Sequence, residues 1–379
     1  MKKWMVCIVL LTAGFASAQE EITGAQQTGL IQLGSHFQAW RLEHQSTPIN
    51  QFSFPLLLAV PIGGRTRLMV SHKPAYTWWQ NENRINGPSD TWAQLNVLLA
   101  EDRALLNIGM GLPTGKARLN NNQLVLSRLL SRNIFRFSLP AYSQGFQMKA
   151  GLAGAYPLSE RAILGVGAQY IRKGTYHPVE YTYSYDVGNQ TYSTTYSPEY
   201  RAGDEVTGQI GLDIMAGPEI KLMFDLMFTR YGRDVLDGTE IFGSGQRLIA
   251  EGGAFYRYED KKYIWGRLLY RMKGKNEIQQ GFSLHEEEYN SSGYQFDLDF
   301  HGDVTATINS RFAILLNGRF YGDNEYGNGE ASIVGGGIGM AYDLNPVSII
   351  DFQIRYYIGT TDDRQTEGME IITLLKLGF

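Results

Sequence analysis

Hydrophobic and polar side chains alternate with a period of two over most of this 379-residue chain. Within residues 293–306, for example, Phe296 and Leu298 alternate with Asp297 and Asp299. A strand directs successive side chains to opposite faces, so such a segment can place an apolar face against lipid and a polar face toward an interior. The pattern therefore predicts an all-β chain whose strands have one apolar and one polar face.

Turn residues divide this alternating sequence into sixteen predicted strands, and one hairpin more or fewer would give 18 or 14. Each segment has about ten residues or slightly more, the length that a tilted strand needs to cross a bilayer. The predicted fold is an antiparallel transmembrane β-barrel. The strands are expected at about 28–42, 50–61, 66–80, 90–100, 104–113, 144–156, 162–172, 205–215, 220–230, 247–258, 263–273, 293–306, 311–321, 332–343, 349–359 and 369–379.

The connections between these segments alternate between short turns and long loops, as membrane barrels require. The short turns fit the periplasmic side, so the long loops should be extracellular and both termini periplasmic. Residues 369–379 should then pair with about 29–42 and close the barrel. The long loops include about 114–143, 173–204, 231–246 and 274–292.

The amino terminus carries an export signal. Lys2 and Lys3 precede an apolar stretch over residues 4–15, and Ala16-Ser17-Ala18 forms an A-x-A cleavage site. Residues 1–18 are therefore predicted to be a secretory signal peptide. Residues 19–27 would form a short periplasmic segment, followed by a barrel over residues 28–379.

The carboxyl terminus carries a second targeting feature. Residues 369–379 alternate along one strand and end on Phe379. This pattern resembles the terminal signal strand of bacterial outer-membrane barrels, which implies outer-membrane lipid and the barrel-insertion machinery as partners. The predicted location is the outer membrane of a Gram-negative bacterium.

Composition agrees with this picture and excludes other classes of function. The 43 glycines, 18 Phe, 6 Trp and 23 Tyr suit many short strands, tight turns and interfacial aromatic rings. With 34 basic against 38 acidic residues, the net charge of −4 offers no basic surface for nucleic acid. Cys7 is the single cysteine and lies in the predicted signal peptide, so no disulfide or thiolate chemistry is expected.

Aiming the apolar face of each strand at lipid places a mixed set of charged residues on the inner face. In the predicted hairpin around residues 309–310, Asp297 should lie opposite Arg319 and attract it. The inner charges fit either an ion-pair network that braces the barrel or a polar permeation path, and alternation does not separate the two. The candidate lumen-lining residues are Glu251, Arg257, Arg267, Arg271, Asp297, Asp299, His301, Asp303, Arg319, Asp351, Arg355 and Lys376.

No metal or cofactor site is predicted among these residues. His301 and its neighbouring aspartates follow one another at a spacing of two along a strand, so they line up instead of converging on one point. An enzyme is not expected either, because no pairing of serine with histidine emerges from the spacing of the six histidines.

Two of the long loops have local patterns of their own. Residues 120–132 place leucines at a spacing that could form a short amphipathic helix, which would either enter the barrel mouth or cap its rim. Residues 176–200 carry seven tyrosines and read as a β-hairpin above the membrane. That hairpin either packs on itself or stacks its tyrosines on a ligand.

Three short motifs lie within residues 104–178. They are Gly111-Leu112-Pro113-Thr114-Gly115-Lys116, Leu139-Pro140-Ala141-Tyr142-Ser143-Gln144-Gly145 and Ala155-Tyr156-Pro157-Leu158-Ser159. Together they resemble the FadL-like superfamily of outer-membrane barrels, which includes transporters of long-chain fatty acids and aromatic hydrocarbons and barrels linked to phenol degradation. The Asn-Pro-Ala plug motif of fatty-acid transporters does not occur in this sequence, so neither the plug nor the fatty-acid substrate is carried over.

Two functions follow from this reading. The first is an outer-membrane channel or passive transporter for small hydrophobic or aromatic molecules. The second is a non-transporting barrel subunit of an envelope complex, such as a secretion or gliding apparatus. A lumen closed by charge pairing would favour the second function, whereas solute flux would favour the first.

Overall fold

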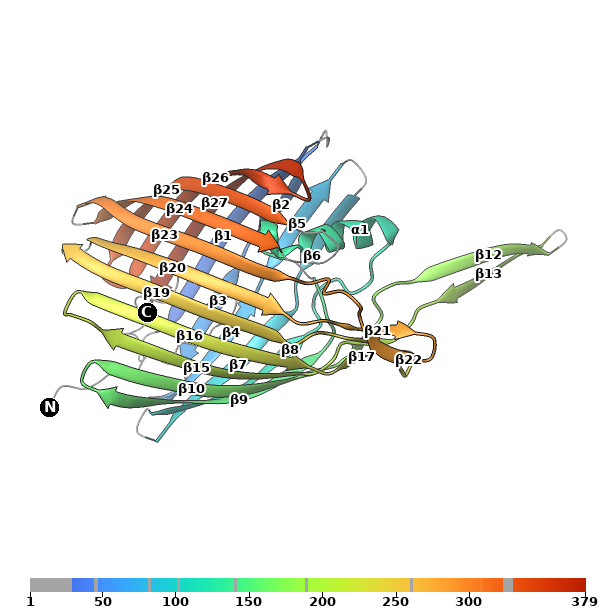
Figure 1. Cartoon of the computed structure of the whole chain (residues 1–379), viewed down its shortest axis with the longest axis horizontal. Coiled ribbons are helices and arrows are strands. Elements are labelled where there is room, and N and C mark those ends of the chain that lie inside the picture. The colour runs from blue at the N-terminus through green and yellow to red at the C-terminus, as the bar shows by residue number, and fades with distance from the viewer. Residues whose placement is uncertain are drawn as a thin grey trace.

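The computed structural model describes residues 29–43, 47–80, 83–100, 103–139, 142–187, 190–259, 262–307, 309–322 and 330–379. The predicted signal peptide and the segment 19–27 lie outside the described residues. The chain forms a closed antiparallel β-barrel of sixteen strands, as the alternation predicts (Figure 1). Each strand pairs with the next one along the chain, so the barrel is a simple meander.

Thirteen of the sixteen strands are unbroken. Their bounds are close to the predicted ones, although several extend a few residues beyond them. They are β1 (Leu30–Leu42), β8 (Ala104–Leu112), β9 (Gln147–Ser159), β10 (Ala162–Lys173), β15 (Glu205–Met215), β16 (Ile220–Tyr231), β19 (Arg247–Glu259), β20 (Lys262–Lys273), β23 (Tyr294–Ala306), β24 (Ser310–Gly322), β25 (Ala331–Asn345), β26 (Ser348–Thr361) and β27 (Arg364–Gly378).

The remaining three barrel strands are each broken in two. The pairs are β2 (Ile49–Ser53) with β3 (Leu56–Pro61), β4 (Thr66–His72) with β5 (Pro74–Trp79), and β6 (Asn83–Pro88) with β7 (Thr91–Leu99). The third of these strands therefore begins earlier than the predicted 90–100. The breaks are neighbours in the wall, because β2 pairs with β5 and β3 pairs with β4.

Prolines account for two of these breaks, since a proline has no N–H to give to a ladder. Pro55 lies in the first break and Pro74 follows the second. The wall nevertheless stays hydrogen-bonded across them. Phe54 N donates to Pro74 O at 2.9 Å, and Ser89 N donates to Lys73 O at 3.0 Å. Neighbouring strands therefore stay connected across the three breaks.

The first and last strands close the barrel. β1 pairs with β27 in a continuous antiparallel register from Leu30 opposite Gly378 to Leu42 opposite Thr366. This confirms the predicted seam. At its end, Gly29 N donates to Phe379 O at 2.6 Å, and Phe379 N donates to Gly29 O at 3.0 Å.

The outer surface of the barrel is apolar. Large hydrophobic side chains that alternate with inward residues are strongly exposed, and Ile338, for instance, is 65% exposed. Exposed apolar patches of this extent are rare on soluble monomers but are what a lipid-facing band requires. Other members of this band are Val166, Ile210, Phe224, Leu298, Ile314 and Ile358. Among the described residues, no helix has the length and apolarity that spanning a bilayer demands.

The long connections gather at one end of the barrel, here named the long-loop end, and the opposite end is named the short-turn end (Figure 1). Beyond the long-loop end, parts of three loops form a second, six-stranded sheet. Its strands are β11 (Thr175–Tyr176), β14 (Tyr200–Arg201), β17 (Arg233–Leu236), β18 (Thr239–Gly243), β21 (Glu277–Gln280) and β22 (Ser283–Glu286).

The tyrosine-rich segment forms the predicted hairpin. Its strands β12 (Tyr181–Val187) and β13 (Gln190–Tyr196) pair only with each other and project away from the barrel (Figure 1). Because Tyr181 pairs with Tyr196 and Tyr185 pairs with Tyr192, the tyrosines share one face. The rings of Tyr185 and Tyr192 stack with centroids 5.7 Å apart. This contact supports self-packing of the hairpin.

Candidate functional site: a loop seated in the barrel

The loop between β8 and β9 contains the predicted helix, α1 (Asn121–Leu130), and a short 3₁₀ turn, η2 (Asn133–Phe135). Asn120 begins the helix with a capping box, in which its side chain accepts from Gln123 N and the Gln123 side chain accepts from Asn120 N. These two bonds satisfy amide groups that the first turn would otherwise leave free. The helix therefore starts from local sequence alone.

The loop packs into the barrel instead of capping its rim. Leu126 and Leu130, on one face of α1, are fully buried, and Phe135 is buried beside them. They share one apolar core with residues of the barrel wall, among them Trp40 of β1 and Tyr357 of β26. The Trp40 ring lies 5.1 Å from that of Phe135 and 5.2 Å from that of Tyr357, measured between centroids. Of the two predicted placements, the structure has the loop inside the barrel mouth.

Asp90 holds both ends of this loop. It lies in the third wall break and is only 8% exposed. Its carboxylate accepts from Gly115 N at 3.2 Å and from Gln144 N at 2.9 Å, while its own N–H donates to Tyr142 O at 3.0 Å. Gly115 passes so close to Tyr142 that a Cβ there would lie 2.0 Å from Tyr142 O. The first two motifs of the FadL-like resemblance are therefore the two roots of the loop, and they meet at one carboxylate.

Two buried glutamines of the wall bind the backbone of the loop. The Gln51 side chain donates to Leu139 O at 3.2 Å and accepts from Leu139 N at 3.1 Å. The Gln38 side chain donates to Phe135 O at 3.2 Å and accepts from Ser138 N at 3.0 Å. Both glutamines are fully buried. They replace the water that the irregular backbone of the loop would otherwise need.

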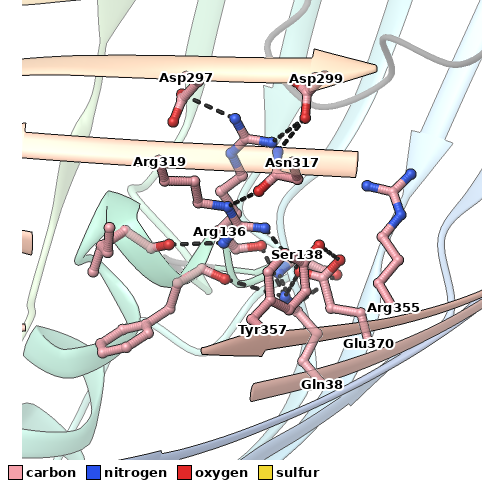
Figure 2. Close-up of polar contacts among 12 residues, drawn as sticks. Gln38, Arg136, Ser138, Asp297, Asp299, Asn317, Arg319, Arg355, Tyr357 and Glu370 are labelled. Atoms are coloured by element: carbon pink, nitrogen blue, oxygen red, sulfur yellow. Dashed lines mark hydrogen bonds and ion pairs between the residues drawn. The ribbon is translucent and has the colours of Figure 1, made fainter. Parts of the chain in front are cut away.

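Arg136 joins the loop to the opposite part of the wall (Figure 2). Its guanidinium group lies 3.0 Å from Asp297 Oδ2 and 3.3 Å from Asp299 Oδ1, both on β23. The Asp297 and Asp299 side chains are only 3% and 12% exposed. The pairing matters because a buried carboxylate without a partner is costly.

Arg319 forms the centre of a second buried group (Figure 2). It donates to Ile134 O of the loop at 2.7 Å, and it lies 3.3 Å from Glu370 Oε1. Glu370 also accepts from Gln38 Nε2 at 3.1 Å and from the Tyr357 hydroxyl at 2.8 Å. The loop is thus bonded to strands from both ends of the barrel sequence.

The predicted hairpin register is confirmed, since Asp297 lies directly opposite Arg319. The expected ion pair between these two residues does not form. Asp297 instead forms an ion pair with Arg136, and Arg319 forms one with Glu370. The loop supplied a cation that the pattern of the strands alone could not reveal.

Other candidate residues form pairs along the wall. Glu251 and Arg267 lie 3.1 Å apart, and His301 Nε2 lies 3.1 Å from Asp303 Oδ1. Gln353 bridges its neighbours by donating to Asp351 at 3.0 Å and accepting from Arg355 at 2.7 Å. Arg271 donates to Gln295 at 2.7 Å. Arg257 is exposed beside a β-bulge near the short-turn end and joins none of these groups.

A hollow of about 230 Å³ lies on the wall near the short-turn end. His301 is stacked there between the rings of Tyr263 and Trp265, with centroid distances of 5.2 and 5.8 Å. No group of three or more His, Cys, Asp or Glu side chains in the described part of the chain could hold a metal ion. The lining of the hollow includes Phe255, Tyr263, His301, Asp303, Arg311, Asp351, Gln353 and Lys376.

Several residues of the site were not among the predicted ones. Arg136 lies in a loop, and Asp90 is only the first residue of the predicted strand 90–100, so no periodic signal marks either residue. Gln38 and Glu370 do stand at inward positions of predicted strands, and their alternation could have identified them. The structure also places the Ser138 hydroxyl against His36 Nδ1, a pairing that spacing did not reveal. Among the described residues, His36 Nε2 is buried without a hydrogen-bond partner.

Neither a family model nor a curated protein sequence matches this chain. Solved structures with a similar fold include the CymD monoaromatic hydrocarbon channel, with 9% identity and a TM-score of 0.46 over 94% of this chain and 90% of that one. The Ralstonia pickettii toluene transporter TbuX has 11% identity and a TM-score of 0.42 over 93% and 90%. A Pseudomonas aeruginosa FadL homologue has 9% identity and a TM-score of 0.44 over 92% and 89%. The likeness is one of fold alone.

Proposed function

We propose that this protein is a passive channel for small molecules in the outer membrane of a Gram-negative bacterium, with its short-turn end in the periplasm. The observation that carries the proposal is the loop between β8 and β9. It occupies part of a barrel with a polar interior, where an apolar core, hydrogen bonds and ion pairs hold it against the wall. Such a loop narrows a path without abolishing it.

The substrate class is proposed from the resemblance of residues 104–178. It favours small hydrophobic or aromatic molecules that enter from outside through the long-loop end. Passage needs no bound energy source, because a path and a difference in affinity along it are sufficient. The polar wall limits this proposal to molecules that tolerate charged surroundings, and a wholly aliphatic solute fits it poorly.

Reconstitution in planar lipid bilayers tests the proposal. The wild-type protein should give discrete conductance steps, and a variant in which residues 117–138 are replaced by a short Gly-Ser linker should give larger ones. The linker variant keeps Gly115, Gln144 and Asp90, so the roots of the loop remain joined. Conductance that is equal in the two proteins would contradict the role of the loop as a constriction.

The second candidate is a non-transporting barrel subunit of an envelope complex. The projecting hairpin of β12 and β13 favours it, because an exposed two-stranded ribbon with one tyrosine face is suited to contact another molecule. The same bilayer experiment separates the two functions. If neither the wild type nor the linker variant conducts, the channel is refuted and the subunit is supported.

A further inference from the structure

Three cations lie together on the inner face of β19 and β20, close to the long-loop end. Arg247 of β19 pairs directly with Lys273 of β20, and Ile249 pairs with Arg271. Arg247, Lys273 and Arg271 therefore share one face: Arg247 lies directly opposite Lys273, and Arg271 is two residues from Lys273 on the same strand. Like charges that lie opposite each other in an antiparallel pair repel and destabilise it. We name these three residues the cation cluster.

Inner cations such as Arg267 and Arg319 have acidic partners, whereas among the described residues the cation cluster has none. Among the described residues, no ion pair joins Arg247, Arg271 or Lys273 to a carboxylate, whereas Arg267, four residues before Arg271 on β20, is paired with Glu251. The hydrogen-bond partner of Arg271 is the neutral Gln295. The Arg247 guanidinium lies over the ring of Tyr231, 5.7 Å from its centroid.

Two N–H donors of the cation cluster also lack a hydrogen-bond acceptor among the described residues. The Nε atoms of both Arg247 and Arg271 are buried and have no hydrogen-bond partner in the described part of the chain. Buried donors on charged groups are costly unless they are satisfied. The fold therefore retains three neighbouring cations and two free N–H groups at a position where an acidic side chain would have relieved the cost.

We propose that the cation cluster binds the carboxylate of an anionic solute on its way through the barrel. A guanidinium group offers a planar fork of N–H donors that matches a carboxylate, and two such groups with an ammonium can surround it. The Tyr231 ring beside Arg247 gives an apolar or aromatic body a surface to lie against. The cluster faces the interior, so its ligand is a free solute and not the phosphate of a lipid. This inference rests on the proposed channel function and narrows its substrate to aromatic or apolar carboxylates.

Ion selectivity gives the first test. The full-length protein is reconstituted in a bilayer of phosphatidylcholine alone, which removes anionic lipid as a source of ligand, and the reversal potential is measured in a KCl gradient. The wild type should prefer chloride. In the double variant Arg247→Gln/Arg271→Gln, the chloride-to-potassium permeability ratio should fall by roughly tenfold, the lower end of the effect of a charged cleft on local ion concentration. A double variant that conducts with unchanged selectivity would overturn the proposal.

Ligand binding gives the second test and does not depend on conductance. Benzoate should raise the urea midpoint of wild-type unfolding and should leave the double variant unchanged, while the neutral benzamide should affect neither. In low salt without benzoate, the double variant should be at least as stable as the wild type, because like-charge repulsion is removed. If the double variant is less stable and benzoate acts on both proteins alike, the cluster is structural.

The control is Arg172→Gln, which removes the same charge from an exposed, outward position of β10. It should keep both the selectivity and the benzoate response of the wild type. If neither the wild type nor the linker variant conducts, the channel is refuted, and the benzoate measurement still decides the cation cluster. The two failures are therefore distinguishable.

Discussion

Replacing Asp90 by alanine should release the loop from the barrel mouth. The variant loses the two acceptors that hold Gly115 N and Gln144 N. Hydrogen bonds to a charged group contribute about 1.5–3 kcal/mol each, so their loss should favour the unseated loop by about 3–6 kcal/mol. Since 1.4 kcal/mol corresponds to a factor of ten, the unseated population should rise by about 10² to 10⁴. Asp90→Asn keeps one acceptor and should produce about half of this change in free energy.

Limited trypsin digestion of the folded protein measures this population. When the loop opens and closes faster than it is cut, the cleavage rate is proportional to the open fraction. Cleavage at Arg128 and Arg132 should therefore accelerate in the order wild type, Asp90→Asn, Asp90→Ala. Asp186→Ala, in the projecting hairpin, serves as the matched control and should behave as the wild type does. Equal cleavage of Asp90→Ala and the wild type would refute the assignment of Asp90 as the residue that holds the loop.

Three further predictions concern packing, pairing and pH. Gly368→Ala places a Cβ 2.4 Å from the buried Trp40 ring, so urea unfolding should show a loss of about 1–3 kcal/mol, whereas Gly208→Ala, with no atom within 4 Å of its Cβ, should lose far less. Arg136→Gln leaves two buried aspartates without their cation and should accelerate the same tryptic cleavage, with Arg136→Lys intermediate because it keeps the charge but not the fork. Glu287 directly follows β22 of the six-stranded sheet; burial raises its pKa, but hydrogen bonds from Asn276 and Ser291 outweigh this and hold the pKa below its usual 4.5. The resulting stability is present above pH 4.5 and is lost as the pH falls through the depressed value, so amide exchange in β21 and β22 should increase there and not between pH 6 and 8.

The barrel wall was predictable because the two faces of every strand contact different environments. Lipid on one side and a polar interior on the other impose alternation, and the Phe296 and Asp297 positions of β23 follow it directly. Short turns then fix the register, which is why Asp297 was correctly placed opposite Arg319. The wall breaks also had a visible signal in Pro55 and Pro74, although the expected strands ran through both.

The seat of the loop was not predictable from its own sequence. The leucine spacing and the Asn120 cap are local and were enough to predict α1. The choice between the lumen and the rim depends on Gln38, Gln51 and Arg319, which come from strands far from the loop in the chain. Because the loop has no periodic relation to these strands, only their arrangement in space could reveal the contact.

The seam between β1 and β27 has a consequence for assembly. Gln38 of β1 donates to Glu370 of β27 and, from the same amide, to the carbonyl groups of Phe135 and Arg136. The pairing of β1 with β27 therefore also involves the loop between β8 and β9, which is synthesised well before β27. A barrel closed with the loop outside would therefore lack the hydrogen bonds from Gln38 to the loop at its seam.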